Sequence, residues 1–293
     1  MIRPSTAGWL FAGPALAVIA LFFGLPVLAA FALSLTDFDI YALADTGNLR
    51  FVGLHNYWQL LHNPLFWKAL GNTLYFVVVG VPLSIAMSLG AALLLHSKLG
   101  WLKPFFRTAY FAPVVTTVVA VAVIWKYLFH ARYGLVNWVL SYLGVDPIDW
   151  LGDPHWAMPM IILFAVWKNF GYNMIIILAG LQSIPEDLYE AARIDGATPA
   201  RQFWHVTLPM LGPVLLLVGI LTVAGYFQLF AEPYVITLGG PLQSTVSVLY
   251  LMYEEGFKWW NLGNASAVAF LLFVLMTATT SGLLWFARRK GVE

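Results

Sequence analysis

One short stretch of the sequence, WKNFGYN at positions 167–173, places polar side chains within an otherwise apolar run. Amide side chains donate and accept hydrogen bonds, and a lysine ammonium donates them. A helix turns by about 100° per residue, so the polar side chains of this stretch fall within an arc of about 140°. They are Lys168, Asn169, Tyr172 and Asn173. The pattern predicts one polar stripe that could line a path for a hydrophilic molecule.

A second polar set in a later apolar run consists of Tyr226, Gln228 and Glu232. The i, i+4 spacing predicts Gln228 and Glu232 on one helix face. Ionisable groups inside a membrane are costly and usually face the interior of a helix bundle or a water-filled path. Alternatively, both sets join helices to one another, with Lys168 and Glu232 either paired or near the outer surface. Weaker path candidates are small polar residues that commonly serve packing: Asn72, Thr116 and Thr117.

The sequence offers no residue set for covalent or metal chemistry. It contains no Cys, which excludes disulfides, cysteine nucleophiles and thiolate metal sites. Its six His residues are scattered without H-E-x-x-H spacing, and we interpret them as ordinary surface side chains. The phosphate-binding pattern G-x-x-x-x-G-K-[ST] is absent as well. We therefore expect no catalytic residue, no metal, no cofactor and no ATP hydrolysis by this chain.

A charged island, EDLYEAARIDGATPARQFWHVTLP at 186–209, separates two apolar runs. Six of its first sixteen residues are charged, against 10% of the whole chain. Ser183 and Glu186 match a capping box at the start of a helix. Gly196 suits the left-handed position that follows a helix end, so the first helix is predicted to end near Asp195.

A second short helix is predicted from Thr198–Pro199 to His205, and Leu208–Pro209 is expected to end it before the next apolar run. One face of the first helix would carry Leu188, Ala191, Ala192 and Asp195. Two adjacent alanines allow close approach of another surface, so the island could fit a groove on another protein. The alternative is an amphipathic linker that lies on the membrane.

Composition places these features in a membrane protein. Of the 293 residues, 61% are hydrophobic, and a soluble domain would carry roughly 25% charged residues. A bilayer-spanning helix needs about 20 apolar residues, and we predict six spans: 9–35, 69–95, 106–129, 158–181, 211–235 and 265–287. The first is about twice as long as the core of a signal peptide, so we expect an uncleaved anchor.

The distribution of Lys and Arg predicts the orientation. With six spans, both termini share one side with nine basic residues: Arg3, Lys98, Lys103, Arg107, Arg193, Arg201, Arg288, Arg289 and Lys290. The opposite side holds four: Arg50, Lys68, Arg132 and Lys258. This bias predicts cytoplasmic termini and a cytoplasmic island. The lack of any basic run argues against a nucleic-acid partner.

Three polar or turn-rich segments are expected on the outer side: 36–67, 130–157 and 236–264. The first contains NYWQLL, a candidate interfacial helix. The third contains TLGGP, which is typical of a turn.

The stretch EAARIDGATPARQFWHVTLP resembles the signature loop of ABC importer permeases: E-A-A, a Gly four residues later, then a hydrophobic residue followed by Leu-Pro. The matching positions are Glu190, Ala191, Ala192, Gly196, Leu208 and Pro209. AGLQSIPEDLYEAA and FAEPYVITLGGPLQST are similar to the carbohydrate branch, near the F-type permeases of maltose, lactose and glycerol-phosphate systems. The resemblance covers nearly the whole chain, which is expected to lack the extra N-terminal spans and the large outer domain of the maltose-system subunit.

The resemblance implies an all-α, six-span type I importer permease whose loop docks into a cleft of a cytoplasmic ATPase. It implies a bacterial inner-membrane protein that carries a sugar or polyol and forms half of a translocation pathway. The expected partners are a second permease in a heterodimer, an ATPase dimer that binds ATP, an outer solute-binding protein and membrane lipid. The expected regions are an anchor with an outer loop (1–68), a permease core (69–287) with a coupling loop (182–210), and a tail (288–293).

Three alternatives remain at this point. A secondary transporter would show internal repeats and broken helices in matching halves, and no repeat is found. A membrane enzyme would need a clustered acid, base or metal set at the bilayer edge, which the scattered His and outer Asp residues do not provide. A permease of the same class could also carry a solute other than a carbohydrate.

Overall fold

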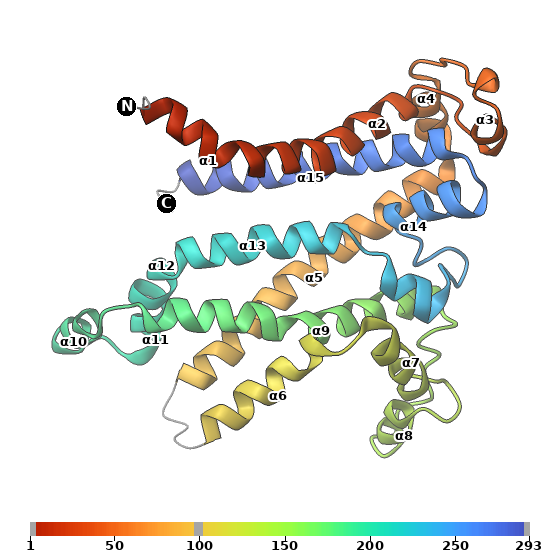
Figure 1. Cartoon of the computed structure of the whole chain (residues 1–293). Coiled ribbons are helices and arrows are strands. Elements are labelled where there is room, and N and C mark those ends of the chain that lie inside the picture. Colours follow the sequence, from red (N-terminus) through yellow and green to blue (C-terminus); the bar gives the residue numbers. More distant parts are fainter. Residues whose placement is uncertain (1–3, 97–101, 290–293) are drawn as a thin grey trace. The chain divides into compact units, whose positions relative to one another are not determined.

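The computed structural model describes residues 4–96 and 102–289, and these ranges are helical apart from turns, loops and two isolated β-bridges (Figure 1). Three of the basic residues that predict orientation lie outside them: Arg3, Lys98 and Lys290. Of the predicted tail, only Arg288 and Arg289 are described.

Four long apolar helical segments confirm four of the predicted spans. Two short helices, α1 (Pro4–Ile19) and α2 (Leu25–Ser34), are joined by a π-helical turn and contain the first, Phe11–Ser34. The other three are α5 (Pro64–His96), α9 (Pro154–Gln182) and α15 (Leu262–Arg289). The most apolar window of Phe11–Ser34 has no buried residue, so lipid or another subunit must cover it.

The third span is not the continuous helix that the sequence predicts. Two helices, α6 (Lys103–Val115) and α7 (Val118–Leu128), meet at an angle of 101°. Thr116 and Thr117 between them are extended, with ψ of 151° and 136°. The run VVTT around this break is β-branched throughout, which weakens helix propensity, and Pro113 offers no N–H to the last turn of α6.

The fifth span also differs from its predicted limits of 211–235. The helix α13 (Gly212–Phe227) follows the island at a 65° bend and ends eight residues early. Pro233 explains the early end, because a proline has no N–H for the carbonyl of Leu229 four residues before it. The Ser247 hydroxyl donates to that carbonyl instead. Counting each bent pair as one span gives the predicted six.

The predicted outer segments contain short helices, of which only one was expected. NYWQLL lies in α4 (His55–His62), as predicted. Additional helices are α3 (Ile40–Ala44), α8 (Leu135–Ser141) and α14 (Val248–Tyr253).

The 236–264 segment is partly buried, which its reading as an outer loop did not anticipate. Its turn is confirmed by left-handed φ angles at Leu238 and Gly239. Farther along, Thr245 and Ser247 are fully buried. Asn72 of α5 donates to the Val246 carbonyl at 2.9 Å, so at least one of the weaker path candidates serves packing.

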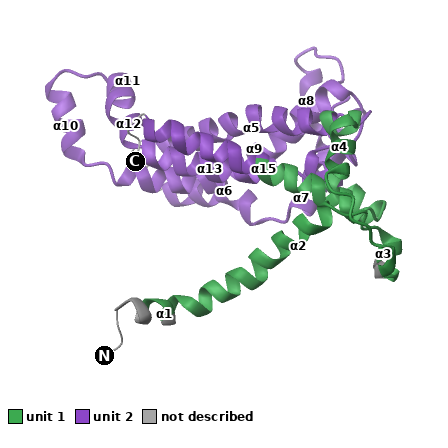
Figure 2. Cartoon of the chain, turned by 90° about the horizontal axis from the view of Figure 1, so that it is seen from above, with its two compact units in different colours: residues 1–67, 251–274 green, residues 68–250, 275–293 purple. Residues whose placement is uncertain are grey.

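The chain divides into two compact units (Figure 2). Unit 1 comprises residues 1–67 and 251–274. It therefore combines the N-terminal segment with residues 251–274, which the sequence predicts to lie in the permease core (69–287). Within unit 1, the Asn56 amide donates to the carbonyls of Ser34 and Thr36, and Phe31 contacts Phe270 with ring centroids 4.8 Å apart.

Unit 2 comprises 68–250 and 275–293 and holds the candidate site. Its core includes Leu95 of α5, Met174 and Ile177 of α9, and Val218 of α13. α9 and α6 pack closely because Gly171 of α9 has no side chain. A Cβ atom at this position would lie 2.1 Å from the Tyr110 carbonyl oxygen of α6.

Candidate functional site

The charged island forms three short helices beyond the end of the unit 2 helices, as Figures 1 and 2 both show. They are α10 (Glu186–Ile194), α11 (Pro199–Gln202) and α12 (Leu208–Met210), the last two joined by a π-helical turn. Gly196 has φ +74°, which confirms its left-handed position. The Thr198 side chain accepts from the Arg201 N–H at 3.4 Å, as expected at a helix start.

Two details of the predicted island are wrong. Ser183 donates to the Gly180 carbonyl at the end of α9, so no capping box forms and Pro185 precedes α10 without a side-chain cap. Leu208 and Pro209 do not end the second helix, because Pro209 lies in the first turn of α12, where its missing N–H is tolerated. The chain bends two residues later, at Leu211.

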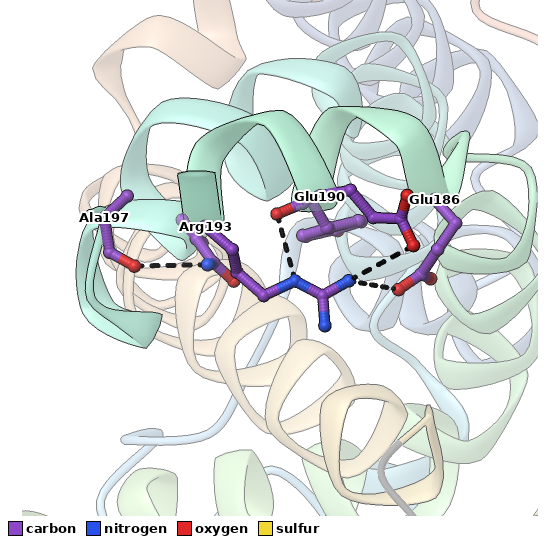
Figure 3. A network of polar contacts seen from close by, with 6 residues as sticks. Glu186, Glu190, Arg193 and Ala197 are labelled. Atoms are coloured by element: carbon purple, nitrogen blue, oxygen red, sulfur yellow. Dashed lines mark hydrogen bonds and ion pairs between the residues drawn. The ribbon is translucent and has the colours of Figure 1, made fainter. Parts of the chain in front are cut away.

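Few contacts within the chain hold α10. No residue of α10 is buried, and Leu188 is 39% exposed. Arg193 pairs with Glu186 at 3.0 Å, donates to the Tyr189 carbonyl at 3.3 Å, and lies 3.9 Å from Glu190 (Figure 3). Such exposed pairs contribute up to about 1 kcal/mol. The arrangement shapes α10 internally and leaves its alanine face, at Ala191 and Ala192, available for a partner.

A hydrogen bond connects α10 to the island's return into the membrane. The Tyr189 hydroxyl lies 2.9 Å from the Thr207 hydroxyl, and Thr207 is buried. The Ala197 N–H donates to the Ala192 carbonyl across the glycine turn at 2.8 Å, and the Gln202 amide donates to the Ala197 carbonyl after that turn. A displacement of α10 can therefore reach the base of α13 through side chains as well as through the backbone.

A cavity of about 310 Å³ lies among the membrane helices of unit 2. This size is near the lower end of the roughly 300–1,000 Å³ typical of small-molecule sites. The cavity collects six of the seven residues predicted for a substrate path: Asn169, Tyr172, Asn173, Tyr226, Gln228 and Glu232. Two polar sets about 60 residues apart in sequence thus form one wall.

The polar groups of this wall differ in how firmly they are held. The Asn173 amide is buried and donates to the Thr222 hydroxyl at 2.9 Å, and that hydroxyl donates to the Val218 carbonyl. Asn169 and Gln228 are exposed. The Asn169 amide donates to the Ala165 carbonyl one turn earlier in α9 at 2.9 Å. The wall therefore combines two amides bonded within the protein with the exposed Gln228 side chain.

Comparison with known proteins gives a family for this arrangement. Residues 80–292 match the family described as "Binding-protein-dependent transport system inner membrane component". The match covers most of the chain and includes both the island and the cavity residues after position 80. The chain belongs to this family.

Relatives of this permease support the assignment. It is 39% identical to the lactose transport system permease protein LacF of Rhizobium radiobacter, over 97% of this chain and 94% of LacF. It is 37% identical to the trehalose/maltose transport system permease protein MalF of Thermococcus litoralis, over 95% and 92% respectively. The secondary-transporter and enzyme alternatives are therefore excluded.

A solved structure shares the fold of the permease. A bacterial ABC transporter chain involved in the import of the acidic polysaccharide alginate superposes with a TM-score of 0.79, at 22% identity over 96% of both chains. The predicted all-α fold of a type I importer permease in the inner membrane is confirmed.

Lys168 is the one predicted path residue of the permease that does not line the cavity. It is buried, and its Nζ donates to the carbonyls of Pro113 at 2.6 Å and Val114 at 3.1 Å. These carbonyls end α6, where a helix dipole favours a positive charge. No ion pair joins Lys168 to Glu232 within the described ranges. Lys168 instead connects α9 to the end of α6.

Gln228 and Glu232 do not share a helix face. Gln228 follows the last residue of α13, and a non-helical break separates it from Glu232. Both still line the cavity, because the chain turns around it.

Sequence reasoning missed seven residues that line the cavity: Phe76, Val114, Ala165, Leu221, Thr222, Gly225 and Leu229. A signal existed for Thr222, which lies four residues before Tyr226 and so on the same helix face. Phe76 gave none, since its role depends on stacking against Tyr226, with ring centroids 4.8 Å apart. In residues 4–96 and 102–289, no group of three His, Asp or Glu side chains could hold a metal ion.

Proposed function

We propose that this permease carries a sugar or related polyol across the inner membrane and that the cavity wall contacts the solute. One observation carries the proposal. Asn169 and Tyr172 of α9, and Gln228 directly after α13, are exposed beside a cavity among segments that must otherwise face hydrocarbon. Exposed amides are costly there unless water, a solute or protein covers them. Lactose and trehalose/maltose in the names of the two relatives support a carbohydrate.

The open side of this wall requires a second subunit. We place a different permease opposite the exposed residues, so that each chain supplies half of the pathway. Two copies of a separate ATPase would bind ATP in the cytoplasm, one of them on α10, and an outer solute-binding protein would deliver the sugar. The termini and the island are cytoplasmic in this arrangement. The described basic residues Lys103, Arg107, Arg193 and Arg201 support this orientation.

The site residues of the island act as a coupling element in this proposal. Glu190, Ala191 and Ala192 lie on α10, whose exposed face would enter the ATPase cleft, and Gly196 sets the turn. Leu208 and Pro209 lie in the helix that leads to α13. Closure of the ATPase would move α10 and thereby α13, whose last residues line the cavity.

Transport by the reconstituted importer tests the proposal. The sugar is chosen by screening the binding protein against a panel. We expect Asn173→Ala and Gln228→Ala each to lower sugar uptake by about tenfold or more, because a hydrogen-bonding partner of the solute is lost. Basal ATP hydrolysis and assembly should remain. Thr279→Ala is the matched control, since Thr279 bonds within α15 and does not line the cavity. Normal uptake by both cavity variants would contradict the proposed path.

A further inference from the structure

A second cavity of about 300 Å³ lies where three membrane helices of unit 2 end, on the side of the island. Leu95 and His96 close α5, Lys103 begins α6, and Gln182 ends α9. The cavity is therefore at a boundary between apolar helix surface and water. Figure 1 shows these three helix ends near one another.

The lining of this cavity is basic at the rim and apolar within. Lys103 and Arg107 are four residues apart on one face of α6, and the His96 imidazole and the Gln182 amide also line the cavity. No carboxylate lines the cavity, and neither Lys103 nor Arg107 forms an ion pair with any described residue. Leu95 and Leu178 are buried and also line it.

The two cations lie in the first turns of α6, where no acidic side chain offsets their charge. Like charges at i, i+4 repel, and the start of a helix is the positive end of its dipole. The residue before α6 is Leu102, which provides no side-chain cap for the first N–H groups. An anion in the cavity would relieve the repulsion and satisfy these donors.

We propose that this cavity binds the phosphate headgroup of an anionic phospholipid. The phosphate would lie between Lys103 and Arg107, and the acyl chains would extend along the apolar helix surface beside the cavity. In the proposed orientation, on which this inference rests, the cavity lies at the inner leaflet, and a basic pocket between helix ends there suits such a headgroup. Binding would fix the start of α6 beside the end of α9, from which the island continues.

Native mass spectrometry of the full-length permease, purified with its partner subunits in mild detergent, tests the site. Phosphatidylglycerol and phosphatidylcholine of equal chain length are titrated separately, and inorganic phosphate is added as a competitor. We expect one phosphatidylglycerol per chain to be retained in preference to phosphatidylcholine. Lys103→Gln/Arg107→Gln should weaken retention by about 25-fold, from about fivefold for each cation near an anionic headgroup.

Two further variants control for charge and folding. Lys126→Gln/Arg132→Gln removes two cations from the other end of the span and should keep retention within about twofold. Lys103→Arg/Arg107→Lys keeps both charges and should also retain the lipid. As a second measurement, phosphatidylglycerol should raise the melting temperature of the wild type more than that of Lys103→Gln/Arg107→Gln.

Three results would overturn the proposal. The first is equal retention of phosphatidylglycerol by wild type and Lys103→Gln/Arg107→Gln. The second is equal retention of the two lipids, or displacement of the lipid by millimolar phosphate, which would assign the cavity to any lipid or to a soluble anion. The third is loss of the ATPase from Lys103→Gln/Arg107→Gln with lipid retention unchanged, which would assign the two cations to a protein partner.

Discussion

At the scale of single residues, the shape of the cavity among α5, α9 and α13 depends on one missing side chain. A Cβ atom at Gly80 of α5 would lie 2.6 Å from Cε1 and 3.0 Å from Cδ1 of Tyr226. The Tyr226 ring lines the cavity and stacks on Phe76, so it cannot retreat without disturbing a second ring. The absence of a side chain at Gly80 therefore determines the position of the Tyr226 ring in the cavity wall.

We expect Gly80→Ala to lower sugar transport severalfold, because the displaced Tyr226 ring narrows the cavity. Overpacking of this kind costs about 1–3 kcal/mol, so the melting temperature should fall as well. Gly90→Ala, in the same helix, is the control, since nothing lies within 4 Å of its added methyl group. Uptake assays and thermal unfolding measure both effects. Wild-type uptake by Gly80→Ala would show that the ring moves freely.

At the scale of elements, the island consists of short helices joined by a turn at Gly196. Neither α10 nor α11 contains a buried residue. Gly196 requires a left-handed backbone, while space around it is open. Substitutions there therefore act through the backbone and not through a clash. This distinction allows a test of docking that leaves the membrane helices untouched.

We expect Gly196→Val to release the ATPase, because a β-branched residue in the left-handed region costs about 1–2 kcal/mol and would redirect α11. Ala192→Trp should have the same effect by blocking close approach to α10. Gly196→Asn should bind normally, since Asn tolerates this conformation. Co-purification of the ATPase measures docking. Wild-type amounts of ATPase with both Gly196→Val and Ala192→Trp would favour the linker on the membrane surface.

The bend between α6 and α7 is a second feature at this scale, and Lys168 contacts it directly. Lys168 donates to the two carbonyls that the break exposes. We expect Lys168→Met to lower the melting temperature of the permease, because the Val114 carbonyl would lose its side-chain donor, and an unpaired carbonyl costs about 1–3 kcal/mol when buried. The Pro113 carbonyl would still accept from the Thr116 hydroxyl. The apparent affinity for sugar should change little.

Lys126→Met is the control for this prediction, since Lys126 is an exposed lysine of α7. Thermal unfolding in detergent and the sugar concentration at half-maximal uptake are compared for the two variants. A loss of sugar affinity at unchanged stability would return Lys168 to the substrate path.

At the scale of the whole molecule, the proposed orientation has a direct chemical test. The chain has no Cys, so single cysteines report their own position. Gln243 and Ala200 are both exposed and lie in segments assigned to opposite sides. We expect Gln243→Cys to react with an impermeant thiol reagent in intact cells, and Ala200→Cys only after the membrane is opened. Labelling of Ala200→Cys from outside would reverse the topology and remove α10 from any cytoplasmic ATPase.

Several features of the permease followed from local sequence alone. Apolar length set the four continuous spans, because a helix must hydrogen-bond its own backbone in lipid. Gly196 set the turn of the island, because its left-handed conformation is a local property of the backbone. The spacing of Lys168 to Asn173 put Asn169, Tyr172 and Asn173 beside one another on α9, where all three line the cavity.

Only the tertiary structure decided where polar groups far apart in sequence find partners. Lys168 has the same helical spacing as its neighbours, yet it leaves the cavity wall because the carbonyls of a broken helix lie within its reach. Gln228 and Glu232 both line the cavity because the helix is interrupted between them. Pro233 leaves the Leu229 carbonyl without its helical donor, and the hydroxyl of Ser247, distant in sequence, donates to that carbonyl. Gly80 and Phe76 carry no local signal, since their roles arise from contact with Tyr226 on another helix. Helical periodicity fixes the face on which a residue lies, but the neighbouring helix determines what that face contacts.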